Sequence, residues 1–234
     1  MSKKHLKNIN APRTWPIERK KKVWITRPNS GNHSLKDSMP LSVIFIDILG
    51  YAKTSREIKK ILALGEIKVN GKVRKDRKFP VGIFDVIELP EENYRLLYNN
   101  RGKFYLDKID KKDTLVLYQV YNKTILGKNK VQLNFSTGEN LITDNKEIKT
   151  GDSVIIKDKK IKEVLKFEKG APIYLTGGKH VGMVGKVDIF DSNKVIFADG
   201  KEKYQTMKKF GFVIGKDKPM INIKTRWIRC KKSG

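Results

Sequence analysis

Residues 40–89 constrain the fold most strongly, because two short helical patterns run directly into a basic β-hairpin. Apolar residues recur at helical spacing from Leu41 to Ile48, directly after Pro40, which suits a first helical position. Gly50 then ends this first helix. The segment therefore predicts a compact, positively charged platform rather than a catalytic pocket.

The second predicted helix begins at a capping box formed by Thr54 and Glu57. Its apolar side contains Ile58 and Leu62, and Gly65 ends it. Three basic side chains remain for the outward face, and these are Arg56, Lys59 and Lys60.

A β-hairpin follows, because Asn70-Gly71 between alternating residues favours a type I′ turn. Alternation predicts one apolar face made of Ile67, Val69 and Val73. The opposite face is expected to carry Lys68, Lys72 and Arg74, and the positive surface continues through Lys75, Arg77 and Lys78. Residues 84–89 are predicted to form a closing strand.

The charge of the chain favours a polyanionic partner. It carries 51 Lys and Arg against 25 Asp and Glu, a formal net charge of +26 over 234 residues. Nucleic acid is the favoured partner and an anionic membrane surface the alternative. The ends are the most basic parts, with ten basic and two acidic residues in 1–40 and eleven and two in 201–234. Because Trp15 and Trp24 lie within the N-terminal arm, the arms are expected to order only against phosphate; solvated tails are the alternative.

Few residues suit metal binding or disulfide formation. The single cysteine, Cys230, excludes an internal disulfide and fits a reducing cytosol. With only three histidines besides, no closed zinc site is expected. The apolar run 43–46 is too short to span a membrane, and no apolar segment follows the basic N-terminus as in a signal peptide. The sequence predicts a cytoplasmic protein without metal or cofactor.

Short apolar–polar alternations separated by turn signals fill residues 103–168 and predict a small, barrel-like β domain. Further along, residues 177–187 contain four glycines, which can adopt positive φ and let a ligand backbone approach closely. Val181, Val184 and Val187 recur every third residue and are expected to pack a bent strand. No phosphate-binding P-loop is present, because Val187 follows Gly185-Lys186.

Two of these segments resemble known RNA-binding motifs. The order of a helix, Gly50, a helix from Thr54-Ser55-Arg56-Glu57, Leu64-Gly65 and a Val69-Asn70-Gly71 hairpin resembles the S-four RNA-binding fold, also called the αL motif. In that family the second helix and the hairpin contact structured RNA. The resemblance thus implies RNA contacts by Lys53, Thr54, Ser55, Arg56, Lys59, Lys60, Lys68, Asn70, Lys72 and Arg74. For Thr54, Ser55 and Asn70 the alternative is a structural role in the helix cap and the turn.

The glycine-rich loop resembles the KOW motif of ribosomal proteins and some transcription factors, over about 28 residues through Val195-Ile196-Phe197. This implies RNA contacts by Lys179 and Lys186, whereas His180 is expected to pack within the loop.

The order of arm, αL module, β domain and KOW loop resembles the archaeal–eukaryotic family of small-subunit ribosomal protein four, over residues 3–224. The resemblance implies a structural constituent of the small subunit in the cytoplasm, bound to 16S-type ribosomal RNA and neighbouring ribosomal proteins, with no small-molecule substrate. Two departures are Asn32, where proline is expected, and the unmatched basic end 225–234. Further RNA contacts are expected from Lys3, Lys4, Lys7, Arg13, Trp15, Arg19, Lys20, Lys21, Lys22, Arg27, Arg77 and Lys78.

The predicted fold class is α+β with several modules: an αL module, a β-barrel-like domain and an SH3-like KOW module between basic arms. The predicted boundaries are 1–39 for the N-terminal arm, 40–90 for the αL module, 91–168 for the central β domain, 169–212 for the KOW module and 213–234 for the C-terminal extension.

Two other classes of function compete with the ribosomal interpretation. An RNA-modifying enzyme is disfavoured, since no paired carboxylates lie in an apolar setting and no catalytic residues emerge. A free RNA chaperone or transcription elongation factor would use the KOW loop as a general nucleic-acid adaptor.

Overall fold

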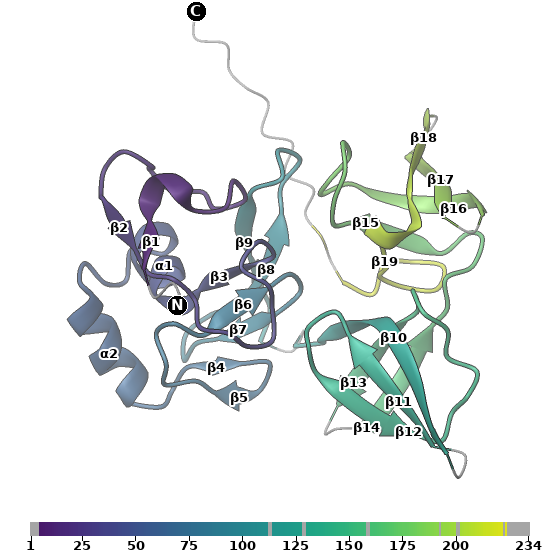
Figure 1. Ribbon diagram of the computed structural model, residues 1–234, viewed down its shortest axis with the longest axis horizontal. Helices are drawn as coiled ribbons and strands as arrows, with labels where there is room; N and C mark the ends of the chain where they lie inside the picture. Colours follow the sequence, from purple (N-terminus) through teal and green to yellow (C-terminus); the bar gives the residue numbers. More distant parts are fainter. Residues whose placement is uncertain are drawn as a thin grey trace, which may run out of the picture.

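A computed structural model describes residues 5–223 of the chain, apart from 112, 113, 128, 129, 158, 159, 192, 200, 201 and 222. The described residues form three five-stranded sheets, two small two-stranded sheets and a few short helices. The predicted α+β class is thus confirmed, with strands predominating. In Figure 1 the first sheet and the helices lie on the left, and the other two large sheets lie on the right, one above the other.

The first predicted helix is present, but it changes type along its length. The Leu49 N–H donates to the Ile44 carbonyl at 2.9 Å, which is the i→i+5 spacing of a π-helical turn. Gly50 then adopts φ of 70° and ends the helix, as the sequence predicts. The two parts are α1 (Leu41–Val43) and η2 (Ile44–Ile48), and α2 (Ser55–Ala63) follows.

The first large sheet extends beyond the predicted module boundary at residue 90. A short turn connects β7 to β8, so that residues 93–109 pair with the αL strands rather than with the central sheet. Local hairpin pairing therefore decides where this sheet ends. Its order is β5-β4-β7-β8-β9, and its strands are β4 (Lys68–Val69), β5 (Lys72–Val73), β7 (Val86–Glu88), β8 (Asn93–Tyr98) and β9 (Phe104–Ile109); β3 (Ser38–Pro40) pairs separately with β6 (Pro80–Gly82).

The hairpin turn is confirmed, but the predicted faces of its second strand are exchanged, since Val73 pairs with Lys68 and Lys72 pairs with Val69. Asn70 and Gly71 have φ of 53° and 75°, as a type I′ turn requires. Across this two-residue turn Lys68 pairs with Val73, and paired residues share a face. Val73 therefore joins Lys68 on the solvent face, where it is 45 % exposed, instead of packing with Val69.

The N-terminal segment is folded onto the αL module, whereas the sequence predicts that it orders only against phosphate. Trp15 is buried, and its indole Nε1–H donates to the Ser38 carbonyl at 2.8 Å. The Thr14 carbonyl accepts from the Phe104 N–H of β9. An apolar side chain and backbone bonding thus outweigh the charge of the segment, which contains β1 (Leu6–Lys7), η1 (Asn8–Asn10) and β2 (Trp24–Ile25).

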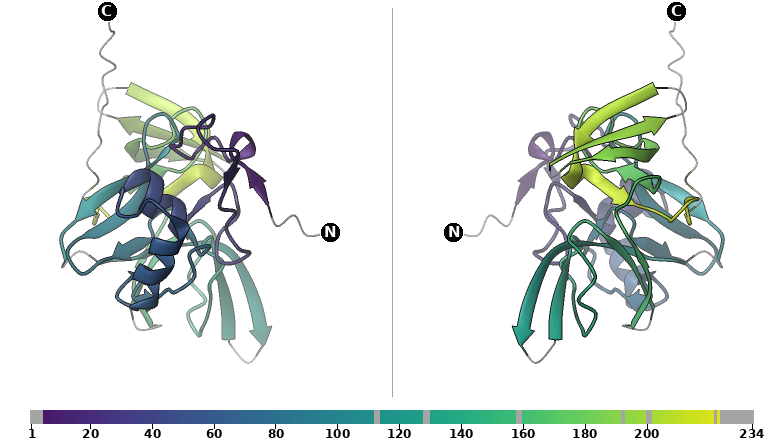
Figure 2. Two further views of the ribbon diagram at one scale, coloured as in Figure 1. Left: turned by 90° about the vertical axis from the view of Figure 1, so that its left-hand side faces the viewer. Right: turned by 90° about the vertical axis from the view of Figure 1, so that its right-hand side faces the viewer.

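The central sheet has the order β12-β11-β10-β13-β14 and a small core of its own. The ends of β10 and β11 project away from the rest of the molecule (Figure 2). The core is built from Tyr118, Val120, Val131, Leu133, Phe135, Ile148 and Val154. The strands are β10 (Leu117–Gly127), β11 (Lys130–Phe135), β12 (Asn140–Thr143), β13 (Ser153–Lys157) and β14 (Lys160–Leu165).

The third large sheet contains the glycine-rich loop and has the order β18-β17-β16-β15-β19. Gly182, with φ of 81°, lies so close to the β8–β9 turn that a Cβ there would be 2.7 Å from the Asn99 carbonyl oxygen. The absence of a side chain at Gly182 therefore lets the backbone of this same chain, at Asn99, approach closely. Val187 packs in the core as predicted, whereas Val181 and Val184 are half-buried. The elements are β15 (Pro172–Leu175), β16 (Val184–Phe190), β17 (Lys194–Asp199), β18 (Glu202–Met207), η3 (Lys208–Phe210) and β19 (Gly211–Val213).

The first and third sheets share one hydrophobic core. The Phe84 ring lies 5.1 Å from that of Tyr174 and 4.3 Å from that of Phe212. The Tyr174 hydroxyl donates to the Tyr98 carbonyl and accepts from its N–H, each at 2.8 Å. The first and third sheets are therefore packed rigidly against each other.

No helix in the described part of the chain is long and apolar enough to cross a bilayer.

Candidate nucleic-acid interface

The outward face of α2 carries the most accessible group of predicted contact residues. Arg56, Lys59 and Lys60 lie at i, i+3 and i+4, so they share one face, and all three are exposed. No ion pair holds any of them among the described residues. In Figure 1, α2 lies at the outer edge of the molecule, far from the central and third sheets. The face can therefore meet a polyanion without first breaking a salt bridge.

The helix cap orients this face and uses two polar residues to do so. The Glu57 N–H donates to Thr54 Oγ1 at 3.3 Å, and the Glu57 carboxylate accepts from the Lys53 N–H at 2.8 Å and from the Thr54 hydroxyl at 2.9 Å. These bonds, that of Lys53 above all, lower the pKa of Glu57. Thr54 thus takes the capping role that the sequence left as an alternative. Ser55 Oγ accepts from Arg77 Nη1 at 3.4 Å, which brings Arg77 to the start of the helix.

Two cavities lie beside β2 and share Trp24 in their walls, and we call them together the Trp24 groove. The larger cavity is also lined by residues of α1, η2 and the loop before α2. The two cavities have volumes of about 640 and 430 Å³ and also share Ile25 and Thr26. The larger cavity also contains Lys21, Lys22, Lys53 and Ser55. The smaller contains Arg27, Arg77 and Lys78. Many of the predicted contact residues therefore converge on this groove.

The two cavities differ in charge. In the larger one, Lys21 lies 3.1 Å from a Glu18 carboxylate oxygen and Lys22 lies 3.3 Å from one of Asp47. The wall of the smaller cavity includes three cationic side chains and, among the described residues, no carboxylate. The smaller cavity is therefore the more favourable for an anion.

Several predicted N-terminal contacts are corrected by the structure. Trp15 is only 1 % exposed and cannot stack on a base. Arg19 is half-buried, and its guanidinium donates to the carbonyls of Ala11 and Pro12, each at 2.8 Å. Both side chains thus hold the segment in its fold. Lys7, Arg13 and Lys20 are exposed, as expected, whereas Lys3 and Lys4 lie outside the described residues.

The hairpin contributes less surface than predicted. Asn70 donates to an Asp85 carboxylate oxygen at 2.7 Å and accepts from the Val86 N–H at 2.8 Å, so its side chain serves the turn. Lys72 lies 2.8 Å from a Glu139 carboxylate oxygen of the central sheet. The Arg74 guanidinium lies 4.2 Å over the Phe79 ring and is half-buried. Lys68 remains exposed on the solvent face.

A buried ion pair holds the hairpin turn to the N-terminal segment. His33 Nε2 lies 2.8 Å from an Asp85 carboxylate oxygen, and that oxygen also accepts from the Gly82 N–H at 2.8 Å. Burial lowers the pKa of His33, but the charge and hydrogen bond of Asp85, together with the charges of Asp37 and Glu139, outweigh burial, so the pKa is raised above 6.5. The charged pair therefore links three segments that converge behind the interface.

The His33 pair should make the stability of the fold depend on pH. A raised folded-state pKa adds stability that is fully present below about pH 6.5 and is lost as pH rises through the folded value. We expect His33→Gln to reduce the free energy of unfolding more at about pH 6 than at about pH 9. Urea titrations of both proteins at the two pH values measure this. Equal losses at both would show that the imidazolium charge contributes nothing.

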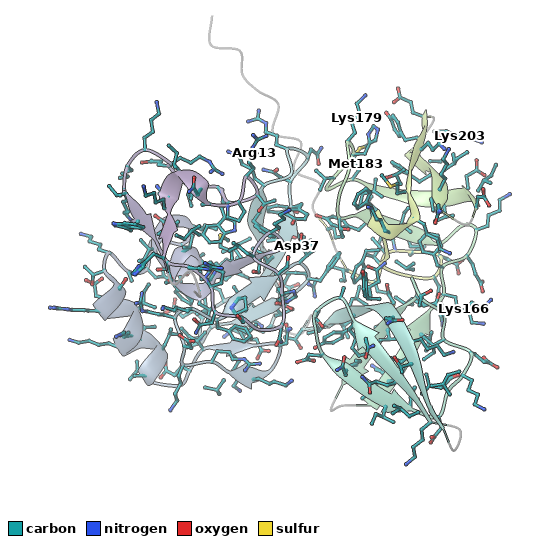
Figure 3. The ribbon with its side chains drawn as sticks, in the orientation of Figure 1. Arg13, Asp37, Lys166, Lys179, Met183 and Lys203 are labelled. Atoms are coloured by element: carbon teal, nitrogen blue, oxygen red, sulfur yellow. The ribbon has the colours of Figure 1, made fainter. Side chains whose placement is uncertain are left out.

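The two predicted contacts of the glycine-rich loop lie apart from α2. Lys179 and Lys186 are both exposed. Figure 3 shows Lys179 near the top of the view, in the loop between β15 and β16 and away from α2. His180 packs with its ring 4.5 Å from that of Tyr204, which confirms the prediction that it packs within its module. The predicted contacts therefore do not form one continuous patch.

Sequence reasoning missed Trp24 as a site residue. Of the two tryptophans in the N-terminal segment, Trp15 was selected, but Trp24 is the exposed one, at 57 %. The available signal was its position among Lys20, Lys21 and Lys22 on one side and Arg27 on the other.

No group of His, Cys, Asp and Glu side chains in the described part of the chain is placed to hold a metal ion.

Three family models match the chain. The model of the ribosomal family S4e matches residues 90–162, that of the RS4NT domain residues 2–36, and that of the S4 domain residues 43–87. The S4 match covers η2, α2 and the hairpin, and the RS4NT match covers the segment that carries Trp24.

Curated relatives resemble the chain over nearly its whole length. The small ribosomal subunit protein eS4 of Methanosphaera stadtmanae is 41 % identical over 233 residues, which cover 95 % of this chain and 96 % of that protein. The protein of the same name from Archaeoglobus fulgidus is 38 % identical, covering 94 % and 97 %. The crystal structure of the 30S ribosomal protein S4e from Thermoplasma acidophilum superposes with a TM-score of 0.69 at 37 % identity, covering 77 % of this chain and 96 % of that one.

Proposed function

The chain belongs to the ribosomal S4e family and is a structural constituent of the small ribosomal subunit that binds ribosomal RNA; we propose that α2 and the Trp24 groove form its main RNA-binding face. The observation that carries this proposal is the outward row of Arg56, Lys59 and Lys60, which no described carboxylate pairs. Lysine and arginine bind RNA chiefly by neutralising phosphates and releasing counterions.

Ordered residues behind this face support a role in shape recognition. The capping box fixes the start of α2, and the His33–Asp85 pair fixes the hairpin beside it. A preorganised basic surface favours one arrangement of phosphates over others, which is how proteins recognise folded RNA. Arg56, Lys59, Lys60, Lys53 and Lys78 are thus assigned to phosphate contacts.

We assign the finer partners by the same reasoning. The RNA is 16S-type ribosomal RNA, and neighbouring small-subunit proteins share the surface, so the chain acts on the ribosome in the cytoplasm. The third sheet is proposed as a KOW module that contacts RNA backbone through Lys179 and Lys186, a second point of attachment apart from α2. No catalytic step, cofactor or small-molecule substrate is part of the proposal.

Sedimentation of the endogenous protein through sucrose gradients at low and high salt tests this function. We expect it to migrate with the small subunit at low salt and to be stripped only by concentrated salt. Release by salt is expected because phosphate contacts weaken as salt rises, and six to ten of them imply a loss of roughly 10³–10⁵ in the affinity of the isolated protein for RNA between about 50 and 200 mM. Protein confined to the top fractions at both salt concentrations would refute a ribosomal role.

A further inference from the structure

We propose that the Trp24 groove is a binding site for one unpaired nucleotide of RNA, with its base stacked on Trp24 in the larger cavity and its phosphate held in the smaller. The inference rests on the proposed RNA-binding function. It adds that the protein recognises an unpaired base of the RNA as well as its phosphates. Phosphate contacts alone would position an RNA helix but would not select an extruded base.

Trp24 is presented for stacking by backbone pairing rather than by burial of its ring. Residue 24 pairs with Lys7 across β1 and β2, which fixes its backbone, while the side chain stays 57 % exposed. The His5 ring lies 5.7 Å away at a tilt of 59°. A large exposed indole within a hollow is unusual for a folded chain and is suited to a π-face partner. Every nucleobase offers such a face.

The larger cavity offers a base both an apolar wall and unused acceptors. Val43, Ile46 and Ala52 contribute apolar surface to it. Asn8 and Ser42 line the same cavity, are 3 % and 0 % exposed, and have side-chain oxygens without a hydrogen-bond partner among the described residues. Buried polar atoms of this kind are normally satisfied. The N–H groups on a base edge would be suitable donors to them.

The charges fix which end of the nucleotide enters which cavity. Glu18 and Asp47 line the larger cavity and pair there with Lys21 and Lys22, which leaves this cavity less attractive to a phosphate than one lined by cations without carboxylates. Carboxylate oxygens can also accept hydrogen bonds from base N–H groups. The smaller cavity contains Arg27, Arg77 and Lys78, which attract a phosphate. Because Trp24 lines both cavities, we place the base against its ring in the larger cavity and the phosphate of the same nucleotide in the smaller one.

Binding of two RNA hairpins by the full chain tests the proposal. The hairpins share one stem, and one of them carries a single bulged uridine. At about 0.1 M salt we expect Trp24→Ala to weaken binding of the bulged hairpin about 5- to 150-fold, while the fully paired hairpin changes less than about twofold. Trp24→Phe should retain most of the bulge preference. A bulged 4-thiouridine should photo-cross-link to the peptide containing Trp24.

Tyr121→Ala is the matched control, since Tyr121 is an aromatic residue 78 % exposed on β10, outside the groove, and should leave both affinities unchanged. Equal affinity of the wild type and Trp24→Ala for the bulged hairpin, or equal weakening of both hairpins, would overturn the proposal. If the wild type bound neither hairpin in a salt-dependent manner, the proposed function itself would fail, and this inference with it.

Discussion

Replacing Arg56, Lys59 and Lys60 together by glutamate should weaken binding of small-subunit ribosomal RNA about 10²–10³-fold at about 0.1 M salt. The three side chains share the exposed face of α2 and lie in no ion pair with described residues, so each is expected to meet a phosphate. Losing them should also reduce the slope of log affinity against log salt by about two to three units. Filter binding over a salt series measures both quantities.

A matched variant separates local contact from loss of overall charge. Lys162, Lys166 and Lys169 are equally exposed, and their replacement by glutamate changes the net charge by the same amount. Figure 3 shows Lys166 at the opposite side of the molecule from α2. If both triple variants lost affinity equally, general electrostatic attraction rather than the α2 face would explain binding.

The parts of the fold that depend on neighbours in sequence could be predicted from the sequence. Thr54 and Glu57 form the expected capping box, and Asn70-Gly71 forms the expected turn, because each motif closes its hydrogen bonds within a few residues. The same holds for the outward position of Lys59 and Lys60, which follows from helical spacing once the apolar side of α2 is buried.

Features that depend on distant contacts could not be predicted in this way. Trp15 and Trp24 have similar basic neighbourhoods in the sequence, and packing in the hydrophobic core, with a hydrogen bond to the Ser38 carbonyl, makes only Trp15 a core residue. Likewise, Gly182 was expected to approach a ligand, but the Asn99 carbonyl occupies the space beside it. Charge density gave no information on which parts of the segment would pack.

The N-terminal segment therefore makes a second strong prediction, on stability. Trp15→Ala should lower the free energy of unfolding by about 3–5 kcal/mol, because it removes a fully buried ring and leaves the Ser38 carbonyl without its indole donor. Urea denaturation followed by circular dichroism measures the change.

Trp24→Ala is the matched control, since it removes the same side chain from an exposed site and should change the free energy of unfolding by no more than about 0.5 kcal/mol. The contrast tests whether the segment is folded before RNA is present. If the two variants were equally stable, residues 5–39 would behave in solution as an arm that orders only on RNA, and Trp15 would again be available for stacking. A large loss for Trp15→Ala alone would mean that the Trp24 groove exists in the free protein. Its RNA partner then meets a preformed site, so the free energy of binding does not have to offset the conformational entropy lost in ordering the segment.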